Sequence, residues 1–291
     1  MCRKGSEPGT LCYARCMIVT IDTGGTKTLV ASFADNGRMG DSIKFPTPKE
    51  PAQYTAELKR IIRERYTGKK VDVVVVALPG IIRNGTAVWC QNLGWANFNA
   101  HTALKNLLPG VPVLIENDAN LAGLSETRAL LSIPRSSLYV TISTGIGSGI
   151  CTNGYIDPGL RYSEAGRALV EYKGKVRQWE SFASGRAIVR DYKKFARDIK
   201  NKRTWRQIAG RMSRGFLAVV PIVQPDVIII GGSVGTYFER YGEFLSEILT
   251  DHLPPHIPCP KIVQAKHPEE AVVYGCYYYG KDYLALAKTA H

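Results

Sequence analysis

Glycines and hydroxyl side chains gather in two short segments, each of which follows an apolar, β-branched run. The segments are Asp22-Thr-Gly-Gly-Thr-Lys27 and Ser143-Thr-Gly-Ile-Gly-Ser-Gly149. Their flanks favour β-strands, so each segment predicts a hairpin with a tight glycine turn. Glycines let the backbone approach a bulky anion, and the free N–H groups and hydroxyls can bind phosphate oxygens. An ordinary β-hairpin is the alternative for either segment alone.

Charged residues in the first hairpin suit a nucleotide phosphate. Asp22 ends the predicted strand 18–21, where a carboxylate can hold a Mg²⁺ ion that bridges phosphates, directly or through water. Lys27 adds a positive charge or only flanks the turn. Neither hairpin fits a P-loop or a strand–GxGxxG–helix unit. Two phosphate-binding hairpins far apart in the chain indicate a duplicated, two-lobed kinase.

A third candidate is Asp118, in the motif Glu116-Asn-Asp-Ala-Asn120. It follows the predicted buried strand 111–115, where a carboxylate can face a cleft. Phosphoryl transfer needs a group that orients the attacking hydroxyl and accepts its proton, and we predict that Asp118 is this base. The structural alternative is that Asp118 caps the following helix, predicted over 119–131.

These segments belong to an ordered set of motifs that resembles one family. The set resembles the ROK family of sugar kinases and sugar-responsive repressors, within the actin-like ATPase superfamily, from Met17 to the C-terminus. It comprises Asp22-Thr-Gly-Gly-Thr-Lys27, Leu78-Pro-Gly80, Asn92-Leu-Gly-Trp95, Glu116-Asn-Asp-Ala-Asn120, Ser143-Thr-Gly-Ile-Gly-Ser-Gly149, Glu164-Ala-Gly166, Glu180-Ser-Phe-Ala-Ser-Gly185 and Gly231-Gly232.

The resemblance implies an α/β fold of the two-lobed actin-like ATPase (ribonuclease H-like) type, with duplicated mixed sheets flanked by helices and a cleft between the lobes. We expect a small lobe at 17–118 and a large lobe at 119–291, with the last helix packed back on the small lobe. Residues 1–16 are expected to be a disordered leader that is not a secretory signal, and Met17 is a candidate for the natural start.

The resemblance also implies the residues of each subsite. The residues expected to bind the sugar are Gly80, Asn92, Asn117, Asp118, Glu164, Arg167 and Glu180. The residues expected to bind the donor phosphates are Asp22, Gly24, Gly25, Thr26, Lys27, Thr144, Gly145 and Gly147. Gly231 and Gly232 are expected to bind the adenosine.

Two departures from the family pattern change the expected chemistry. The family commonly has His where this chain has Arg167. The interpretation that we favour is structural: Arg167 forms an ion pair with Glu164 or Glu171. The alternative is that Arg167 recognises an anionic sugar. The chain has no Cys or His between Glu164 and Glu180, so we predict no structural zinc, with packing, through Trp179, holding the loop instead.

Composition narrows the class of protein. The 291 residues carry a net charge of +13 and 45% hydrophobic residues, as expected of a soluble globular protein with room for two lobes. The charge suits phosphate-bearing ligands. The basic stretch 186–214 is interpreted as solvated helix faces rather than a nucleic-acid surface, with a polyphosphate track as a further alternative. Seven scattered cysteines and no apolar run of membrane length indicate a reduced, cytoplasmic protein.

Elements follow from periodicity and from Gly and Pro placement. Strands are predicted over 28–33, 71–77, 86–89, 138–143, 148–152, 227–230 and 261–265. Helices are predicted over 51–66, 99–108, 186–223 with a break near Asn201, 238–249 and 268–288, and 153–185 is expected to be rich in loops.

The expected function is ATP-dependent, Mg²⁺-assisted phosphorylation of a hexose hydroxyl, with the 6-hydroxyl of glucose or a close relative as the first choice. A polyphosphate-using glucokinase and a non-catalytic sugar-sensing regulator are the alternatives. Family analogy implies a homodimer. Hexose and nucleotide are the expected partners. The short apolar runs argue against a membrane partner, and the interpretation of the basic stretch as solvated helix faces argues against nucleic acid.

Overall fold

The computed structural model describes residues 17–267 and 269–289, so the expectations for residues 1–16 lie outside the described part. The strands are β1 (Met17–Thr23), β2 (Lys27–Ala34), β3 (Met39–Pro46), β4 (Val73–Leu78), β5 (Ile81–Arg83), β6 (Thr86–Cys90), β7 (Trp95–Asn99), β8 (Val113–Asn117), β9 (Ser136–Ile142), β10 (Ile146–Thr152), β11 (Tyr155–Ile156), β12 (Leu169–Tyr172), β13 (Lys175–Gln178), β14 (Val227–Gly231) and β15 (Lys261–Gln264).

The helices are α1 (Pro51–Tyr66), α2 (Ala100–Leu104), α3 (Asp118–Arg128), α4 (Glu180–Ala183), α5 (Gly185–Tyr192), α6 (Lys202–Val223), α7 (Gly232–Gly235), α8 (Gly242–His252) and α9 (Ala271–Thr289), with 3-10 turns η1 (Ala165–Arg167), η2 (Ala196–Asp198) and η3 (Phe238–Arg240). Among the described residues, no helix combines the length and apolarity needed to cross a membrane.

Two five-stranded sheets repeat one topology, β3-β2-β1-β4-β8 and β11-β10-β9-β14-β15. In each, an antiparallel hairpin (β1–β2, β9–β10) is followed by two strands parallel to its first strand. The carboxyl ends of the parallel strands therefore share one edge, and Asp22 lies beside Ala77, which pairs with Glu116. The duplication predicted from the two glycine turns is confirmed.

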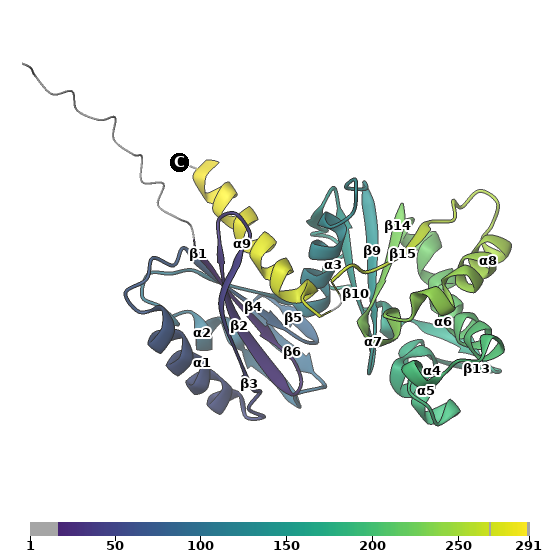
Figure 1. Ribbon diagram of the computed structural model, residues 1–291, viewed down its shortest axis with the longest axis horizontal. Coiled ribbons are helices and arrows are strands. Elements are labelled where there is room, and N and C mark those ends of the chain that lie inside the picture. The colour runs from purple at the N-terminus through teal and green to yellow at the C-terminus, as the bar shows by residue number, and fades with distance from the viewer. Residues whose placement is uncertain (1–16, 268, 290–291) are drawn as a thin grey trace, which may run out of the picture.

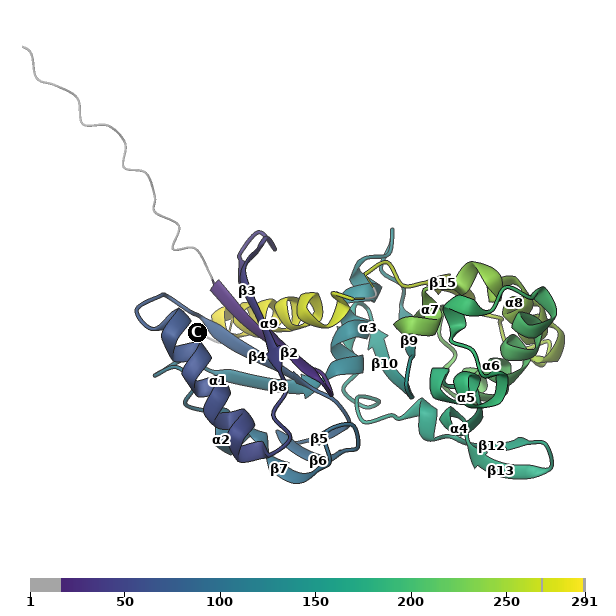
Figure 2. The ribbon, with the colours of Figure 1, turned by 60° about the horizontal axis from the view of Figure 1, so that its bottom comes forward.

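Helices cover both faces of each sheet, and α3 and α9 lie between the sheets (Figures 1 and 2). α1 and α2 close the outer face of the first sheet around Tyr54, Leu58 and Trp95. α9 packs on its inner face, where Val273 and Tyr277 contact Phe33 and Val75. α4, α5, α6 and α8 cover the outer face of the second sheet.

Close contact of α3 with α9 requires a glycine. A Cβ on Gly275 would lie 2.0 Å from the carbonyl oxygen of Leu121. Glu126, fully buried on α3, accepts backbone N–H bonds from Lys266 (2.6 Å) and His267 (2.7 Å), which lie just before α9. The segment that returns the chain to the first sheet is therefore anchored on α3.

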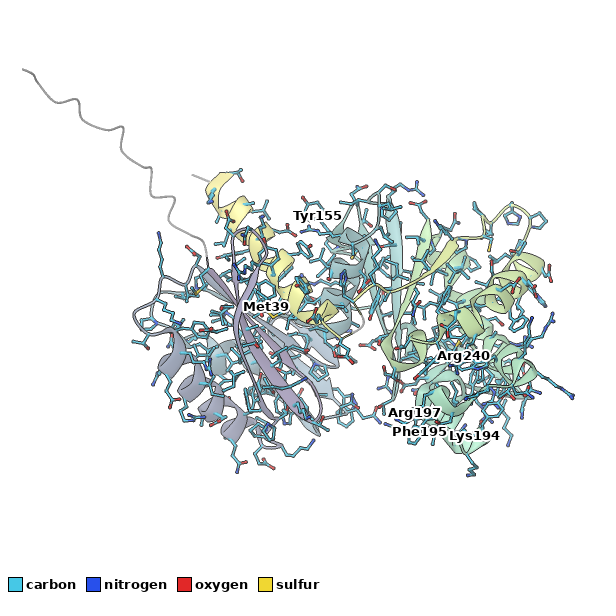
Figure 3. The ribbon with its side chains drawn as sticks, viewed as in Figure 1. Met39, Tyr155, Lys194, Phe195, Arg197 and Arg240 are labelled. Atoms are coloured by element: carbon cyan, nitrogen blue, oxygen red, sulfur yellow. The ribbon has the colours of Figure 1, made fainter. Side chains whose placement is uncertain are left out.

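The basic stretch 186–214 folds as predicted for solvated helix faces. α6 buries Trp205 and Phe216, whereas its Arg203 and Arg206 are exposed. Lys194 and Arg197 are exposed in the segment between α5 and α6. Figure 3 shows Lys194, Phe195, Arg197 and Arg240 on the large-lobe surface, away from α9. Asn201 accepts the N–H of Thr204 as the N-cap of α6, which explains the break before this helix.

Several predicted bounds were wrong. α2 covers only Ala100–Leu104, and a β7 strand occupies Trp95–Asn99. The expected loop region 153–185 contains the β12–β13 hairpin, whose Leu169 and Val176 are exposed. This hairpin shows no apolar alternation in the sequence because neither of its faces is fully covered.

Candidate active site

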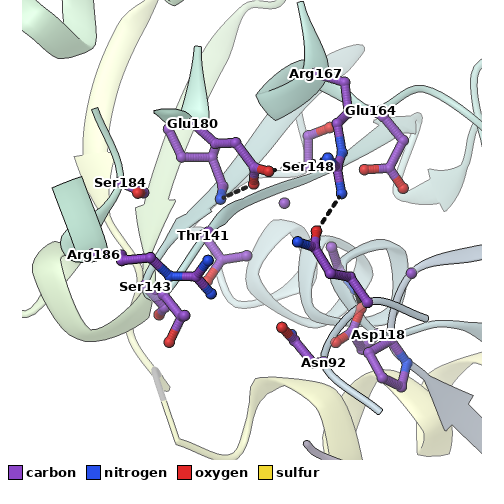
Figure 4. Close-up of a pocket in the computed structure, with 18 of the residues that line it drawn as sticks. Asn92, Asp118, Thr141, Ser143, Ser148, Glu164, Arg167, Glu180, Ser184 and Arg186 are labelled. Carbon is purple, nitrogen blue, oxygen red and sulfur yellow. Dashed lines mark hydrogen bonds and ion pairs between the residues drawn. The ribbon is translucent and has the colours of Figure 1, made fainter. Parts of the chain in front are cut away.

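A cleft of about 570 Å³ opens between the two lobes (Figure 4). Elements of both sheets line it. Its predicted site residues are Gly80, Asn92, Asn117, Asp118, Thr144, Gly145, Gly147, Glu164, Arg167 and Glu180. The remaining predicted residues, which are Asp22, Gly24, Gly25, Thr26, Lys27, Gly231 and Gly232, are outside its lining. The cleft thus gathers the predicted sugar subsite and the second glycine turn.

Asp118 is the first residue of α3, half-buried at the edge of the cleft. Its Oδ1 accepts the N–H of Ala119 at 2.8 Å. The helix cap is Asn117, whose side chain accepts the N–H of Asn120, so the capping alternative for Asp118 is wrong. Burial, followed by the charges of Asp22 and Glu164, raises the pKa of Asp118 to about 7. A carboxylate with this pKa is suited to accept a proton near neutral pH.

The amide of Asn117 is largely committed to the protein. Its nitrogen donates to the carbonyl oxygen of Gly80 at 2.7 Å, and its oxygen accepts the N–H of Asn120 at 2.9 Å. One amide hydrogen therefore remains for a ligand. Gly80 has φ +84°, and a Cβ there would lie 2.1 Å from the carbonyl oxygen of Trp89. Glycine is required at this position by the packing of the chain itself.

Glu116 anchors the segment that carries Asp118. It is 2% exposed and pairs with Arg161, from the loop after β11. Its Oε1 accepts the N–H of Asn117 at 2.8 Å and the side-chain amide of Asn120 at 3.0 Å. Arg161 also contacts the Tyr279 hydroxyl at 3.4 Å, so β8, α3, α9 and this loop are tied together beside the candidate base.

The first glycine turn lies next to the cleft rather than in its lining. A Cβ on Gly25 would lie 3.2 Å from that of Asn92, which lines the cleft. Lys49, which sequence reasoning missed, donates to the carbonyl oxygen of Gly25 at 2.7 Å. Burial raises the pKa of Asp22 to about 6, against the lowering effect of Lys44. The negative charge of Asp22 in turn contributes to the raised pKa of Asp118.

The second glycine turn is held by the large lobe. Ser143 donates its N–H to the carbonyl oxygen of Gly145 at 2.9 Å, and its own carbonyl oxygen accepts the N–H of Gly185 at 2.7 Å. Glu180 accepts the N–H of Ile146 at 3.2 Å. The turn is therefore fixed by α4 and by the start of α5, with Thr144 and Gly147 facing the cleft.

Arg167 has a different partner from the one we favoured. Its Nη1 lies 3.2 Å from Oε1 of Glu180, rather than pairing with Glu164 or Glu171. Its Nη2 donates to Gln91 of the small lobe at 3.0 Å, so this side chain bridges the cleft (Figure 4). The pair forms because the β12–β13 hairpin brings Glu180 back beside η1.

The Gly231-Gly232 turn packs against the second glycine turn. Gly232 has φ +79°, and a Cβ there would lie 2.6 Å from Oγ of Ser143, which in turn accepts the N–H of Ser233. An adenosine site at this turn stays a prediction.

Sequence reasoning missed several residues that line the cleft. They are Gln91, Thr141, Ser148, Ser184, Arg186 and Arg190. Arg186 and Arg190 are four residues apart on α5, directly after a recognised motif, and this spacing was the available signal.

The segment expected to lack zinc is held by packing. Trp179 is fully buried and lies edge-on to Phe216, with ring centroids 4.9 Å apart. A Cβ on Gly215 would overlap its ring at 1.9 Å. Within 17–267 and 269–289, no group of three or more His, Cys, Asp and Glu side chains is placed to hold a metal.

The fold and the cleft define a two-lobed protein of the actin-like ATPase superfamily. The ROK family model matches residues 18–282, and the chain belongs to this family. It is similar to the N-acetylmannosamine kinase of Haemophilus influenzae, at 31% identity, over 93% of this chain and 96% of that protein. The N-acetylmannosamine kinase of Citrobacter koseri is 34% identical to this chain in a match that covers 58% of this chain. The same match spans only 62% of the Citrobacter protein.

Among solved structures, the chain resembles the inorganic polyphosphate/ATP-glucomannokinase of an Arthrobacter strain. The TM-score is 0.68 at 25% identity, over 91% of this chain and 98% of that one.

Proposed function

We propose that this protein is a sugar kinase that transfers the terminal phosphoryl group of ATP to a hexose hydroxyl. One observation carries the proposal: a half-buried carboxylate, Asp118, with a raised pKa lies in an interlobe cleft beside a glycine turn rich in N–H groups and hydroxyls. The ROK relatives, which are named as sugar kinases, support it.

Asp118 accepts the proton of the attacking hydroxyl as the sugar oxygen bonds to the terminal phosphorus and the bond to the bridging oxygen breaks. ADP leaves, and the proton is later released to solvent. Oδ2 of Asp118 can take this proton because Oδ1 accepts the N–H of Ala119. The N–H groups of the second glycine turn donate hydrogen bonds to the phosphate oxygens and so stabilise the negative charge that develops on them.

Sugar hydroxyls require groups that donate and accept. Glu164, whose pKa burial raises, and Glu180 line the same cleft as Asn117 and Asp118. Carboxylates can accept two sugar hydroxyls each. A neutral hexose or an N-acetylated amino sugar fits this lining better than an acidic sugar, because three carboxylates face the ligand.

A divalent cation fits beside Asp22. Asp22 lies near the end of β1 and Asp118 follows β8, so both carboxylates lie at the same edge of the first sheet. Mg²⁺ and its waters would offset their negative charge. When bound, Mg²⁺ neutralises charge on the donor phosphates. Asp22 would hold it, directly or through water.

Two features favour alternatives to a kinase that uses ATP alone. The net charge of +13 and the similarity to a polyphosphate/ATP kinase support polyphosphate as a second donor. The family resemblance to sugar-responsive repressors leaves a non-catalytic sugar sensor as a rival, although Asp118 and both glycine turns are present.

We also propose, by analogy with the family, that the protein forms a homodimer.

The test is a coupled assay of ADP release over a panel of hexoses and N-acetylated amino sugars, with ATP and Mg²⁺. Sugar phosphate formation is measured directly when polyphosphate replaces ATP. We expect turnover with at least one sugar, and its loss in Asp118→Asn with sugar affinity retained. Sugar binding without any phosphoryl transfer from either donor would contradict the kinase and favour the sensor.

A further inference from the structure

Three arginines line the cleft, and two of them are committed to protein partners. Arg167 is held by Glu180 and Gln91. Arg190 donates to Asp191 at 2.6 Å and to the carbonyl oxygen of Ser181 at 3.0 Å. These two guanidinium groups are therefore compensated by the protein itself.

Arg186 differs from both. It is the second residue of α5, it is exposed, and it lines the cleft. Among residues 17–267 and 269–289, its guanidinium forms no hydrogen bond or ion pair. In Figure 4 it points from α5 toward the centre of the pocket, near Thr141 and Ser143, and Asp118 lies on the opposite side.

The backbone fixes Arg186 beside the second glycine turn. Gly185, its neighbour, donates its N–H to the carbonyl oxygen of Ser143 at 2.7 Å. A Cβ on Gly185 would lie 2.6 Å from that same oxygen, so only glycine allows this approach. The start of α5 therefore cannot move away from the turn without losing this contact.

An uncompensated guanidinium in a cleft is suited to an anionic ligand, and its fork matches two oxygens of a phosphate. The sugar side of the cleft already carries Asp118, Glu164 and Glu180, which repel an anion. The phosphate side is where Arg186 lies.

We propose that Arg186 binds the terminal phosphate of the phosphoryl donor and stabilises its charge during transfer. This inference rests on the proposed function. It assigns the site to a chain of phosphates as a chemical class, shared by a nucleoside triphosphate and an inorganic polyphosphate, and not to the sugar.

The kinetic test compares Arg186→Gln with Arg203→Gln, which removes the same charge from an exposed position on α6 outside the cleft. We expect Arg186→Gln to lower kcat/KM for ATP by 10-fold or more and to leave the KM of the sugar within about 2-fold. Arg203→Gln should match the wild type, and Arg186→Lys should recover part of the loss. A change confined to the KM of the sugar, or no change, overturns the proposal.

A binding test does not depend on turnover. Titration calorimetry with inorganic tripolyphosphate and Mg²⁺ should show at least 10-fold weaker binding to Arg186→Gln than to wild type and Arg203→Gln, with unchanged circular dichroism. If wild type binds tripolyphosphate through Arg186 but transfers no phosphate, the proposed function fails, and only the assignment of Arg186 as a phosphate-binding residue stands. If wild type is an active kinase and Arg186→Gln binds tripolyphosphate normally, this inference fails alone.

Discussion

At the scale of single residues, the chemistry depends on how the fold treats Asp118. A solvated aspartate has a pKa near 4, whereas burial and two neighbouring carboxylates raise that of Asp118 to about 7. The same environment makes Asp118 an effective base and makes its ionised form costly to the folded protein. Activity and stability should therefore respond to Asp118 in opposite directions.

The first prediction concerns the pH dependence of activity. Because the base must be ionised, kcat/KM for the sugar should fall about 10-fold per pH unit below pH 7, and more steeply below pH 6, where Asp22 also protonates. Steady-state rates between pH 5.5 and 8.5 measure this. A profile that is flat down to pH 5.5 would contradict the assignment of Asp118 as the base.

The second prediction concerns Asp118→Asn. We expect kcat to fall by about 10²–10⁴. The folded-state pKa lies above the unfolded value, so ionised Asp118 destabilises the fold increasingly from pH 4 to pH 7 and fully above. At pH 8 the neutral variant should therefore be more stable, by about 1–3 kcal/mol, and melt a few degrees higher. The exposed Asp251→Asn is the control. Loss of activity together with a lower Tm would instead indicate misfolding.

At the scale of elements, the site is built where strands end. The end of β4 continues into Gly80, whose carbonyl oxygen accepts the amide of Asn117 at the end of β8. Gly80 can hold this position because glycine adopts the left-handed conformation and has no Cβ to clash with the carbonyl oxygen of Trp89. A substitution at Gly80 should therefore act on the fold and on the sugar subsite together.

Gly80→Ala can be compared with Gly68→Ala. Both glycines have positive φ (+84° and +80°), but a Cβ meets the Trp89 carbonyl at Gly80 and nothing within 4 Å at Gly68. Alanine in the left-handed conformation costs each variant about 1–2 kcal/mol, and Gly80→Ala should lose about 2 kcal/mol more through the clash. Chemical denaturation measures the difference, and the KM of the sugar should rise only for Gly80→Ala. Equal losses in the two variants would show that the clash is relieved.

At the scale of the whole molecule, the net charge of +13 acts on any polyanionic ligand. Long-range attraction is screened over about 10 Å at 0.1 M salt. Exposed lysines and arginines between α5 and α6, including Lys194 and Arg197, extend this field over the large lobe (Figure 3).

The corresponding prediction is a salt dependence that separates the two substrates. Raising KCl from 50 to 500 mM should increase the KM of the phosphate donor several-fold, more for polyphosphate than for ATP, because the longer chain contacts more of the field. The KM of a neutral hexose should change little. Equal salt effects on both substrates would point to a change in the protein itself.

The sequence alone determined the duplicated α/β architecture and the family, because glycine turns and strand ends are local patterns that fix backbone geometry. It also identified Asp118 as the candidate base. Only the tertiary structure decided which charges meet. Arg167 pairs with Glu180 because a hairpin without apolar alternation brings them together, and Asn117, not Asp118, caps α3. Likewise, the difference between the occupied Arg190 and the uncompensated Arg186 depends on side-chain neighbours, which sequence spacing does not specify.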